Sequence, residues 1–89
     1  MGYRIVYAGG FIEKVTKLSD KEQKQVQKTI RLMSEDPIKY PSLRTKKIQG
    51  QKGLFESSVN MDIRIIWSLE KDKLILLLEI GHHNILRKF

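Results

Sequence analysis

Two β-rich runs near the end of the chain, Asp62–Trp67 (DIRIIW) and Leu74–Asn84 (LILLLEIGHHN), decide the fold. A charged turn, EKDK at 70–73, separates them. Apolar residues alternate in the first run, which predicts a strand whose Arg64 faces away from Trp67. Packing alone does not require an arginine inside an apolar strand or two histidines at a strand exit. These placements therefore indicate a functional site at the end of the two strands.

The residues before these runs predict one strand and two helices. Tyr3–Ala8 is β-prone and ends at two glycines, so a first strand is expected there. The apolar residues of a short first helix follow at helical spacing: Phe11, Val15 and Leu18. Ser19 and Glu22 form a capping box, which starts a second helix that ends before Asp36-Pro37. Its inward residues lie at i, i+4 and i+7: Val26, Ile30 and Met33.

The remaining segments complete an α+β domain. A loop between Pro41 and Gly50 precedes three strands of an antiparallel meander, expected at 54–60, 62–69 and 73–80. The order of strand, two-helix hairpin and three-stranded meander predicts a sheet covered on one face by the helices. We expect residues 1–89 to form a single domain.

Composition indicates a small soluble protein. The chain has no cysteine, so nothing indicates a disulfide framework, and a cytoplasmic location is expected. The N-terminal segment offers no apolar run of signal-peptide length. No segment approaches the roughly 18 consecutive apolar residues of a membrane span. We therefore expect no membrane partner.

The net charge of +7 favours polyanionic partners, nucleic acid first, although an acidic protein would also fit. The segment between Pro37 and Phe55 contains no acid and five basic residues: Lys39, Arg44, Lys46, Lys47 and Lys52. A second basic set repeats at spacings of four and three, which predicts one helical face: Lys17, Lys21, Lys24, Lys28 and Arg31. We interpret the helical set as a solvated outer face. The acid-free segment is the better candidate for nucleic-acid binding because it leads directly into the sheet.

The reactive side chains fit metal-independent cleavage of RNA. The chain has no glycine-rich phosphate loop, no HExxH motif and no cysteine nucleophile, and two adjacent histidines without a third ligand make a metal site or other cofactor unexpected. Attack by a 2′-hydroxyl needs a base, cations for the phosphorane oxygens and an acid for the leaving 5′-oxygen. Histidine suits proton transfer near neutral pH, and the planar fork of arginine suits phosphate. The side chains available for these steps are Arg64, His82 and His83, together with the basic loop.

The last two strands resemble those of the RelE/ParE superfamily, the toxins of type II toxin–antitoxin systems. In that family an arginine precedes two apolar residues in the penultimate strand, and the last strand ends in glycine-x-histidine-aspartate. Ile63–Ile66 and Gly81–Asn84 stand at those places. The resemblance extends over nearly the whole chain in length and element order.

The resemblance implies a RelE- or YafQ-like mRNA endoribonuclease that acts on message in the ribosome and is held inactive by a cognate antitoxin. Arg64 then matches the arginine that contacts the phosphate, and His83 the histidine after the last strand. The expected RNA-binding residues are basic: Arg44, Lys46, Lys47, Lys52 and Arg87. Two alternatives stay open, a ParE-like inhibitor of DNA gyrase and a non-catalytic binding member of the same fold.

The chain also departs from the family pattern. Arg87 stands where family members carry an aromatic residue that stacks on a base, so Phe89 or Tyr3 would have to substitute. Asn84 replaces the common aspartate. Where some members have paired lysines, this chain has Glu56 and Ser58.

Three candidate residues also have structural interpretations. Arg64 would pair with Glu56 or Glu79 across the sheet. Asp62, which matches an acid of the YafQ branch, would be an ordinary turn residue, and His82 falls on a variable position.

Overall fold

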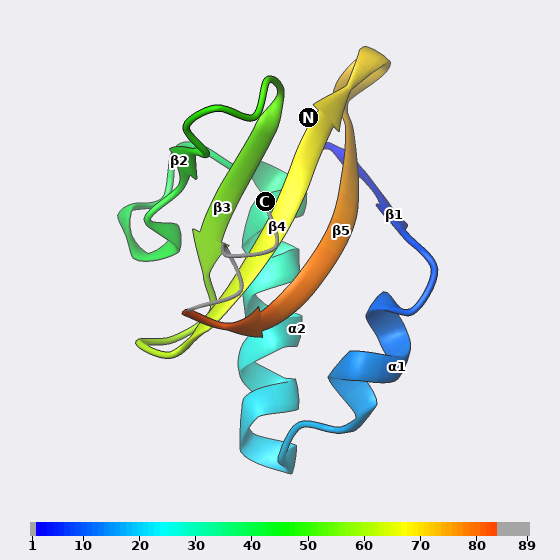
Figure 1. The fold of residues 1–89 in the computed structure, drawn as a ribbon, viewed down its shortest axis with the longest axis vertical. Coiled ribbons are helices and arrows are strands. Elements are labelled where there is room, and N and C mark those ends of the chain that lie inside the picture. The colour runs from blue at the N-terminus through cyan, green and yellow to red at the C-terminus, as the bar shows by residue number, and fades with distance from the viewer. Residues whose placement is uncertain (1, 84–89) are drawn as a thin grey trace.

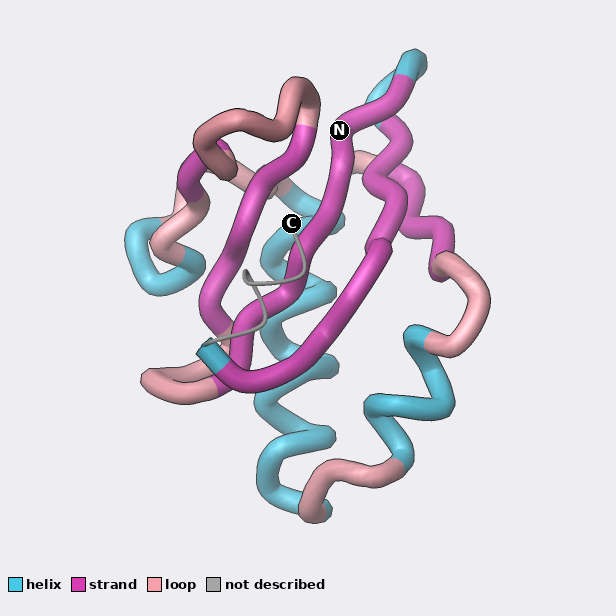
Figure 2. Tube along the Cα trace, viewed as in Figure 1, coloured by secondary structure: helices cyan, strands magenta, loops and turns pink. Residues whose placement is uncertain are grey.

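The structure, a computed structural model, describes residues 2–83. Within them a five-stranded sheet is packed against two helices (Figures 1 and 2). The strands are β1 (Arg4–Tyr7), β2 (Lys46–Lys47), β3 (Leu54–Ser58), β4 (Ile63–Glu70) and β5 (Leu74–His82). The helices are α1 (Phe11–Thr16) and α2 (Asp20–Glu35), and short 3-10 turns lie at η1 (Pro41–Leu43) and η2 (Lys71–Lys73). None of these helices is long and apolar enough to span a membrane.

The strand order is β1-β5-β4-β3-β2, which places the last strand between β1 and β4 (Figure 1). β1 runs parallel to β5, and every other neighbouring pair is antiparallel. Between β4 and β5 the register shifts, because Ile66 pairs with Glu79 whereas Trp67 pairs with Leu77. Leu78 is thus the extra residue of a β-bulge, which increases the local twist of the sheet.

The predicted α+β fold is confirmed, with two corrections at the level of the strands. The segment between Pro41 and Gly50 is not only a loop, because Lys46–Lys47 pairs with β3 as a short edge strand. The last strand does not stop at Gly81 but continues to His82, which pairs with Ile63. The structure therefore places one histidine on the strand and the next immediately after it.

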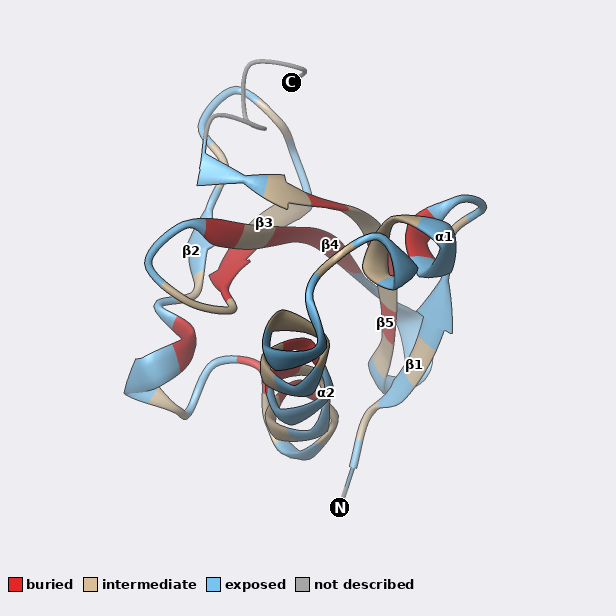
Figure 3. Cartoon of the chain, turned by 90° about the horizontal axis from the view of Figure 1, so that it is seen from below, coloured by how far each residue is buried: buried red, intermediate tan, exposed pale blue. Residues whose placement is uncertain are grey.

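The core lies between the helices and one face of the sheet, as Figure 3 shows by the buried segments of α2 and the strands that face each other. The predicted inward residues Ile65 and Trp67 are both 0% exposed. The ring of Phe55 stacks on that of Trp67 at 4.6 Å, and the indole N–H donates to Ser57 Oγ at 2.9 Å. The remaining buried members of this core come from α1, α2, η1, β4 and β5: Phe11, Val26, Met33, Leu43, Ile63, Ile75, Leu77 and Ile80.

The helix hairpin begins as the sequence predicts. The Ser19 hydroxyl accepts from the Glu22 amide at 3.1 Å, and the Glu22 carboxylate accepts from the Ser19 amide at 3.0 Å. This capping box satisfies two amides that the first turn of a helix cannot pair by itself. The helix then ends at Glu35, directly before Asp36-Pro37. The predicted basic face of the helix is correct for four of its five residues, because Lys17 caps the end of α1 and is not part of α2. All five are exposed, in agreement with a solvated face: Lys17, Lys21, Lys24, Lys28 and Arg31.

Candidate functional site

Arg64 lies near the start of β4, on the sheet face opposite the helices. Its neighbours across the ladder are Ser58 on β3 and Gly81 on β5. The Arg64 side chain is only 17% exposed. Nη1 donates to the carbonyl oxygens of Asn60 at 2.7 Å and Ile63 at 3.3 Å, which fixes the orientation of the fork. Within residues 2–83 the Nη2 group has no protein partner and remains available to an anion.

Glu56 joins Arg64 to the basic edge strand. One carboxylate oxygen lies 3.9 Å from Arg64 Nε and the other 3.3 Å from Lys46 Nζ. The Glu56 side chain is 5% exposed and that of Lys46 is 69% exposed, so the lysine covers a buried carboxylate from the solvent side. Burying the anion is tolerated because two cations flank it. The alternative prediction that Arg64 pairs with an acid across the sheet is thus correct for Glu56. Glu79 pairs instead with Lys14 of α1.

A second group of reactive side chains forms where β4 begins and β5 ends. The Asp62 carboxylate binds two imidazoles, His82 Nδ1 at 2.7 Å and His83 Nδ1 at 3.2 Å. The His82 bond, followed by the His83 bond, holds the pKa of the Asp62 carboxyl below its usual value. Because each imidazole turns Nδ1 to the carboxylate, each leaves Nε2 for another proton donor or acceptor. All three side chains are more than half exposed.

Asn60 connects the two groups, and sequence reasoning missed it. Its side-chain oxygen accepts from the amides of Asp62 at 2.8 Å and Ile63 at 2.7 Å, while its backbone oxygen accepts from Arg64. The side-chain amide of Asn60 also donates to Gln25 of α2 at 2.8 Å. The turn before β4 is therefore anchored to the helix layer. The available signal was an asparagine two residues before an aspartate at a strand start, which is typical of a side-chain-bonded turn.

The predicted RNA-binding residues do not all lie together. Lys46 belongs to the Glu56 pair, whereas Lys47 and Lys52 line a hollow of about 720 Å³ in the loop between β2 and β3. Arg44 is exposed at the end of η1, where its φ is 48°. Arg87 lies outside the described residues, as do Asn84 and Phe89. The structure thus brings Arg64 and Lys46 to one carboxylate and places His83 at the adjoining strand ends.

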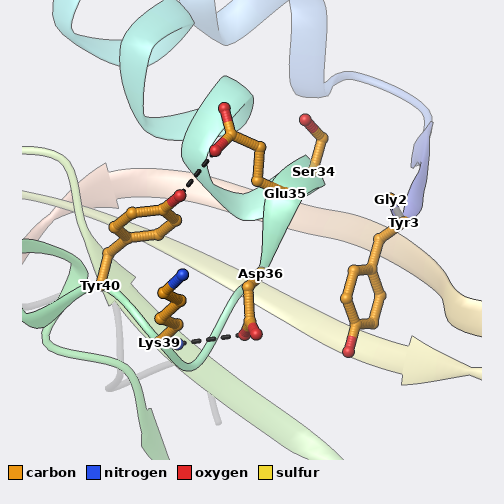
Figure 4. A pocket seen from close by; sticks show the side chains of 7 residues that line it. All are labelled: Gly2, Tyr3, Ser34, Glu35, Asp36, Lys39 and Tyr40. Atoms are coloured by element: carbon orange, nitrogen blue, oxygen red, sulfur yellow. Dashed lines mark hydrogen bonds between the residues drawn. The ribbon is translucent and has the colours of Figure 1, made fainter.

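Tyr3 is the wrong candidate for an aromatic residue at this site. It lines a different hollow, of about 510 Å³, with Glu35, Asp36 and Tyr40 at the end of α2 (Figure 4). The next residue, Arg4, pairs with the start of β5, whereas His82 ends that strand. Eight residues of strand separate those positions, or roughly 26 Å at 3.3 Å per residue.

The hollow at the end of α2 is organised by its own polar groups. The Tyr40 hydroxyl donates to Glu35 at 2.6 Å, which raises the pKa of that tyrosine (Figure 4). The Asp36 carboxylate accepts from the amides of Ile38 and Lys39 at 2.9 and 3.0 Å, and these bonds, first that of Ile38, lower its pKa. Residues 2–83 contain no group of three His, Asp or Glu side chains arranged to hold a metal ion.

Comparison with solved structures defines the class of fold: it is that of the RelE/ParE superfamily of toxins, as the last two strands indicate. The RelE–RelB complex of Pyrococcus horikoshii OT3 contains a chain that matches with a TM-score of 0.81 at 19% identity, covering 96% of this chain and 99% of that one. In the DinJ–YafQ complex of E. coli, the matching chain has a TM-score of 0.71 at 26% identity, with 91% and 93% covered.

A YoeB/ParE toxin from Agrobacterium tumefaciens has the same fold at only 9% identity, with a TM-score of 0.77 and coverage of 90% of this chain and 98% of that one. No protein-family model and no curated protein sequence matches the chain. The similarity to these proteins is therefore in the backbone fold and the order of the helices and strands.

Proposed function

We propose that the protein is the toxin of a type II toxin–antitoxin system and that it cleaves mRNA on the ribosome without a metal ion. The observation that carries the proposal is the pairing of Arg64 with Gly81 beside the pairing of Ile63 with His82. In this register Arg64 lies across one ladder from Gly81, within two residues of both histidines, which supports a joint role for the three side chains. The resemblance to RelE and YafQ toxins supports the same function.

In this proposal Arg64 holds the scissile phosphate. Its Nη2 group faces the substrate while Nη1 stays bound to backbone oxygens, so the fork is oriented before RNA arrives. Donors held in place in advance stabilise the charge that develops on the phosphorane without reorganising. Lys46 adds a second cation at the same face and moves from Glu56 to an RNA phosphate as the substrate binds.

Two proton transfers remain to be assigned. Glu56 is our candidate for the base that takes the proton of the 2′-hydroxyl, because its carboxylate lies beside Arg64. The 2′-oxygen then bonds to phosphorus as the bond to the 5′-oxygen breaks. We assign His83 as the acid that protonates this leaving oxygen through Nε2, with Asp62 orienting the ring through Nδ1. The products are a 2′,3′-cyclic phosphate and a 5′-hydroxyl end.

The proposed partner is a cognate antitoxin with an acidic segment that folds onto the basic surface. A chain of net charge +7 attracts such a segment, and disordered segments that fold on binding cover large areas. The complex should weaken with added salt to the extent that lysine and arginine pairs carry it. A neighbouring reading frame that encodes no protein able to bind this one in pull-down would count against the toxin–antitoxin assignment.

The decisive experiment adds the purified protein to translating ribosomes and maps the ends of the message. New ends with 5′-hydroxyl groups are expected, and they should persist when divalent ions are exchanged for others that support translation. Intact message together with trapped gyrase–DNA complexes would favour the ParE-like alternative. Intact message and unaffected gyrase would favour a non-catalytic binding member of the fold.

A further inference from the structure

The loop between β2 and β3 is built from two successive tight turns. The amide of Gln51 donates to the oxygen of Ile48 at 3.2 Å, and that of Leu54 donates to the oxygen of Gln51 at 3.3 Å. Gly50 and Gly53 occupy the third position of each turn, with φ of 78° and 80°. This left-handed conformation at the third position is typical of type II turns and favours glycine. The loop therefore has a defined shape in the free protein.

This double turn encloses the hollow of about 720 Å³ lined by residues 47–55. Apolar side chains contribute to its lining: Ile48, Leu54 and Phe55. Phe55 is held in place because its ring stacks on the buried Trp67. Lys47 and Lys52 are exposed members of the same lining, and no acidic residue occurs in the sequence between Pro37 and Phe55.

We propose that this hollow binds one unpaired nucleotide of the RNA, with the base on the apolar lining and the adjacent phosphates on Lys47 and Lys52. The inference rests on the proposed function and assigns a base-binding subsite to it. Unpaired bases are recognised by stacking on flat apolar surfaces, whereas lysines follow the phosphates. An occupant of this kind accounts for the apolar lining and the positive charge together, and a preformed loop loses little entropy when it binds.

The position of the hollow along the sheet suits a nucleotide near the scissile bond. Phe55 pairs with Trp67, which lies three residues along β4 from Arg64. That separation corresponds to about 10 Å of strand. Phe55 and Arg64 point to opposite faces of the sheet, so an RNA strand that occupies both positions would pass around the edge of the sheet at β2.

The test measures binding of a short single-stranded RNA whose 2′-hydroxyls are methylated, so that it cannot be cleaved, against the same strand with abasic sugars. Ile48→Ser should weaken binding of the complete strand about tenfold and leave the abasic strand unchanged, since stacking of one base contributes on this scale. Lys47→Gln with Lys52→Gln should weaken both strands and reduce the slope of log Kd against log salt by about two.

One control separates the subsite from general electrostatics, and a second variant tests whether binding depends on the shape of the loop. Lys21→Gln with Lys24→Gln removes the same charge from the exposed face of α2 and should not distinguish complete from abasic RNA. Gly50→Ala meets no atom within 4 Å but forces a side chain into the left-handed region, so it should distort the loop and weaken binding of the complete strand in the same direction as Ile48→Ser.

Equal affinity of the wild type for complete and abasic strands overturns the subsite. So does an Ile48→Ser variant that loses binding of a partner protein while keeping both RNA affinities. Because the strands cannot be cleaved, the result does not depend on nuclease activity. Base-dependent binding without message cleavage would refute the proposed reaction alone, and cleavage without base-dependent binding would refute the subsite alone.

Discussion

The Nε atom of Arg64 lies 3.9 Å from a carboxylate oxygen of Glu56, and the two side chains are only 17% and 5% exposed. Neither group is a free surface charge. Arg64 is further bound to the backbone of the preceding turn, and Glu56 to Lys46. The proposed phosphate-binding cation and the proposed base are therefore neighbours in the resting protein, and substitutions of each test the two proposed roles separately.

Arg64→Ala should reduce message cleavage on ribosomes by roughly a hundredfold or more, as expected for loss of one transition-state contact. The variant also leaves the Glu56 carboxylate with only Lys46, so the free energy of unfolding should fall by about 1–3 kcal/mol. Arg64→Lys retains the charge but not the two-pronged geometry and should recover stability more than activity. Urea unfolding and message-end mapping measure the two effects separately. An Arg64→Ala variant with wild-type cleavage contradicts the assignment.

Glu56→Gln should reduce cleavage by about 10²–10⁴-fold if Glu56 takes the proton of the 2′-hydroxyl. The amide keeps the size of the side chain but is unable to accept that proton at neutral pH. The matched control is Glu79→Gln on β5, which removes a carboxylate paired with Lys14 of α1 and should leave the cleavage rate unchanged. Single-turnover cleavage by the two variants decides the role. Equal rates for both variants would assign Glu56 a structural role only.

His83→Gln should lose about 10²–10⁴-fold in cleavage if the imidazole protonates the leaving oxygen. His82→Gln is the natural comparison, because His82 binds the same carboxylate. We expect the second variant to change the rate little, since Asp62 still holds His83. Both variants should retain the fold, because both side chains are more than half exposed. If His82→Gln is the slower of the two, the roles of the histidines are reversed.

Asp62 should contribute to stability at neutral pH and lose this contribution in acid. Its pKa is lowered in the folded protein by His82 and then by His83. A carboxyl whose folded pKa lies below its unfolded value, about 3.9, stabilises above that value and loses the contribution as the pH falls through the folded pKa. Urea midpoints measured from about pH 6 to about pH 2.5 should therefore fall less steeply below about pH 4 in Asp62→Asn.

Asp36 provides an independent comparison for this effect. Its pKa is lowered by the amides of Ile38 and Lys39, far from the histidines. The urea midpoint of Asp36→Asn should therefore also fall less steeply below about pH 4. Because the two sites share no partner, the changes should add in the double variant. If the urea midpoints of the wild type and Asp62→Asn depend on pH in the same way below about pH 4, the bonds from the histidines to Asp62 do not persist in solution.

Ile65→Asp should unfold the domain, since an unpaired charge in a core of this size costs several kcal/mol. Ile65 is 0% exposed, whereas Leu69, on the same face of the same strand, is 45% exposed. Leu69→Asp is thus a control with the same chemical change outside the core, and it should remain folded. Circular dichroism of the two proteins at 25 °C compares them directly. A folded Ile65→Asp protein would contradict the described packing.

The arrangement of helices and meander follows from local sequence signals, and these were predicted well. The capping box of α2, the inward face of that helix and the alternation in β4 each depend on residues a few positions apart. The edge strand β2 was missed because it contains only two residues, both lysines, and lysine is uncommon in strands. Its pairing with β3 depends on the double turn, whose geometry the glycines Gly50 and Gly53 make possible.

The candidate site was predictable in part. Arg64 and His83 stand out because their residue types are unusual for their positions. The bond from His82 to Asp62 and the bridging role of Asn60 depend on the register between β4 and β5. The bulge at Leu78 changes this register by one residue between the Ile66 and Trp67 pairs. No local pattern specifies such a shift. The buried position of Glu56 between two cations likewise depends on pairing across three strands.

The position of β5 has a consequence for the timing of folding. Within residues 2–83, β1 has no other strand partner, and β5 is synthesised after every other described element. The N-terminal strand must therefore wait for a contact about 70 residues away, and closing so long a loop makes completion of the sheet a late step. His82 is the last residue of β5, and His83 follows it directly. A nascent chain consequently lacks the assembled candidate site until β5 has been synthesised and has paired with β4.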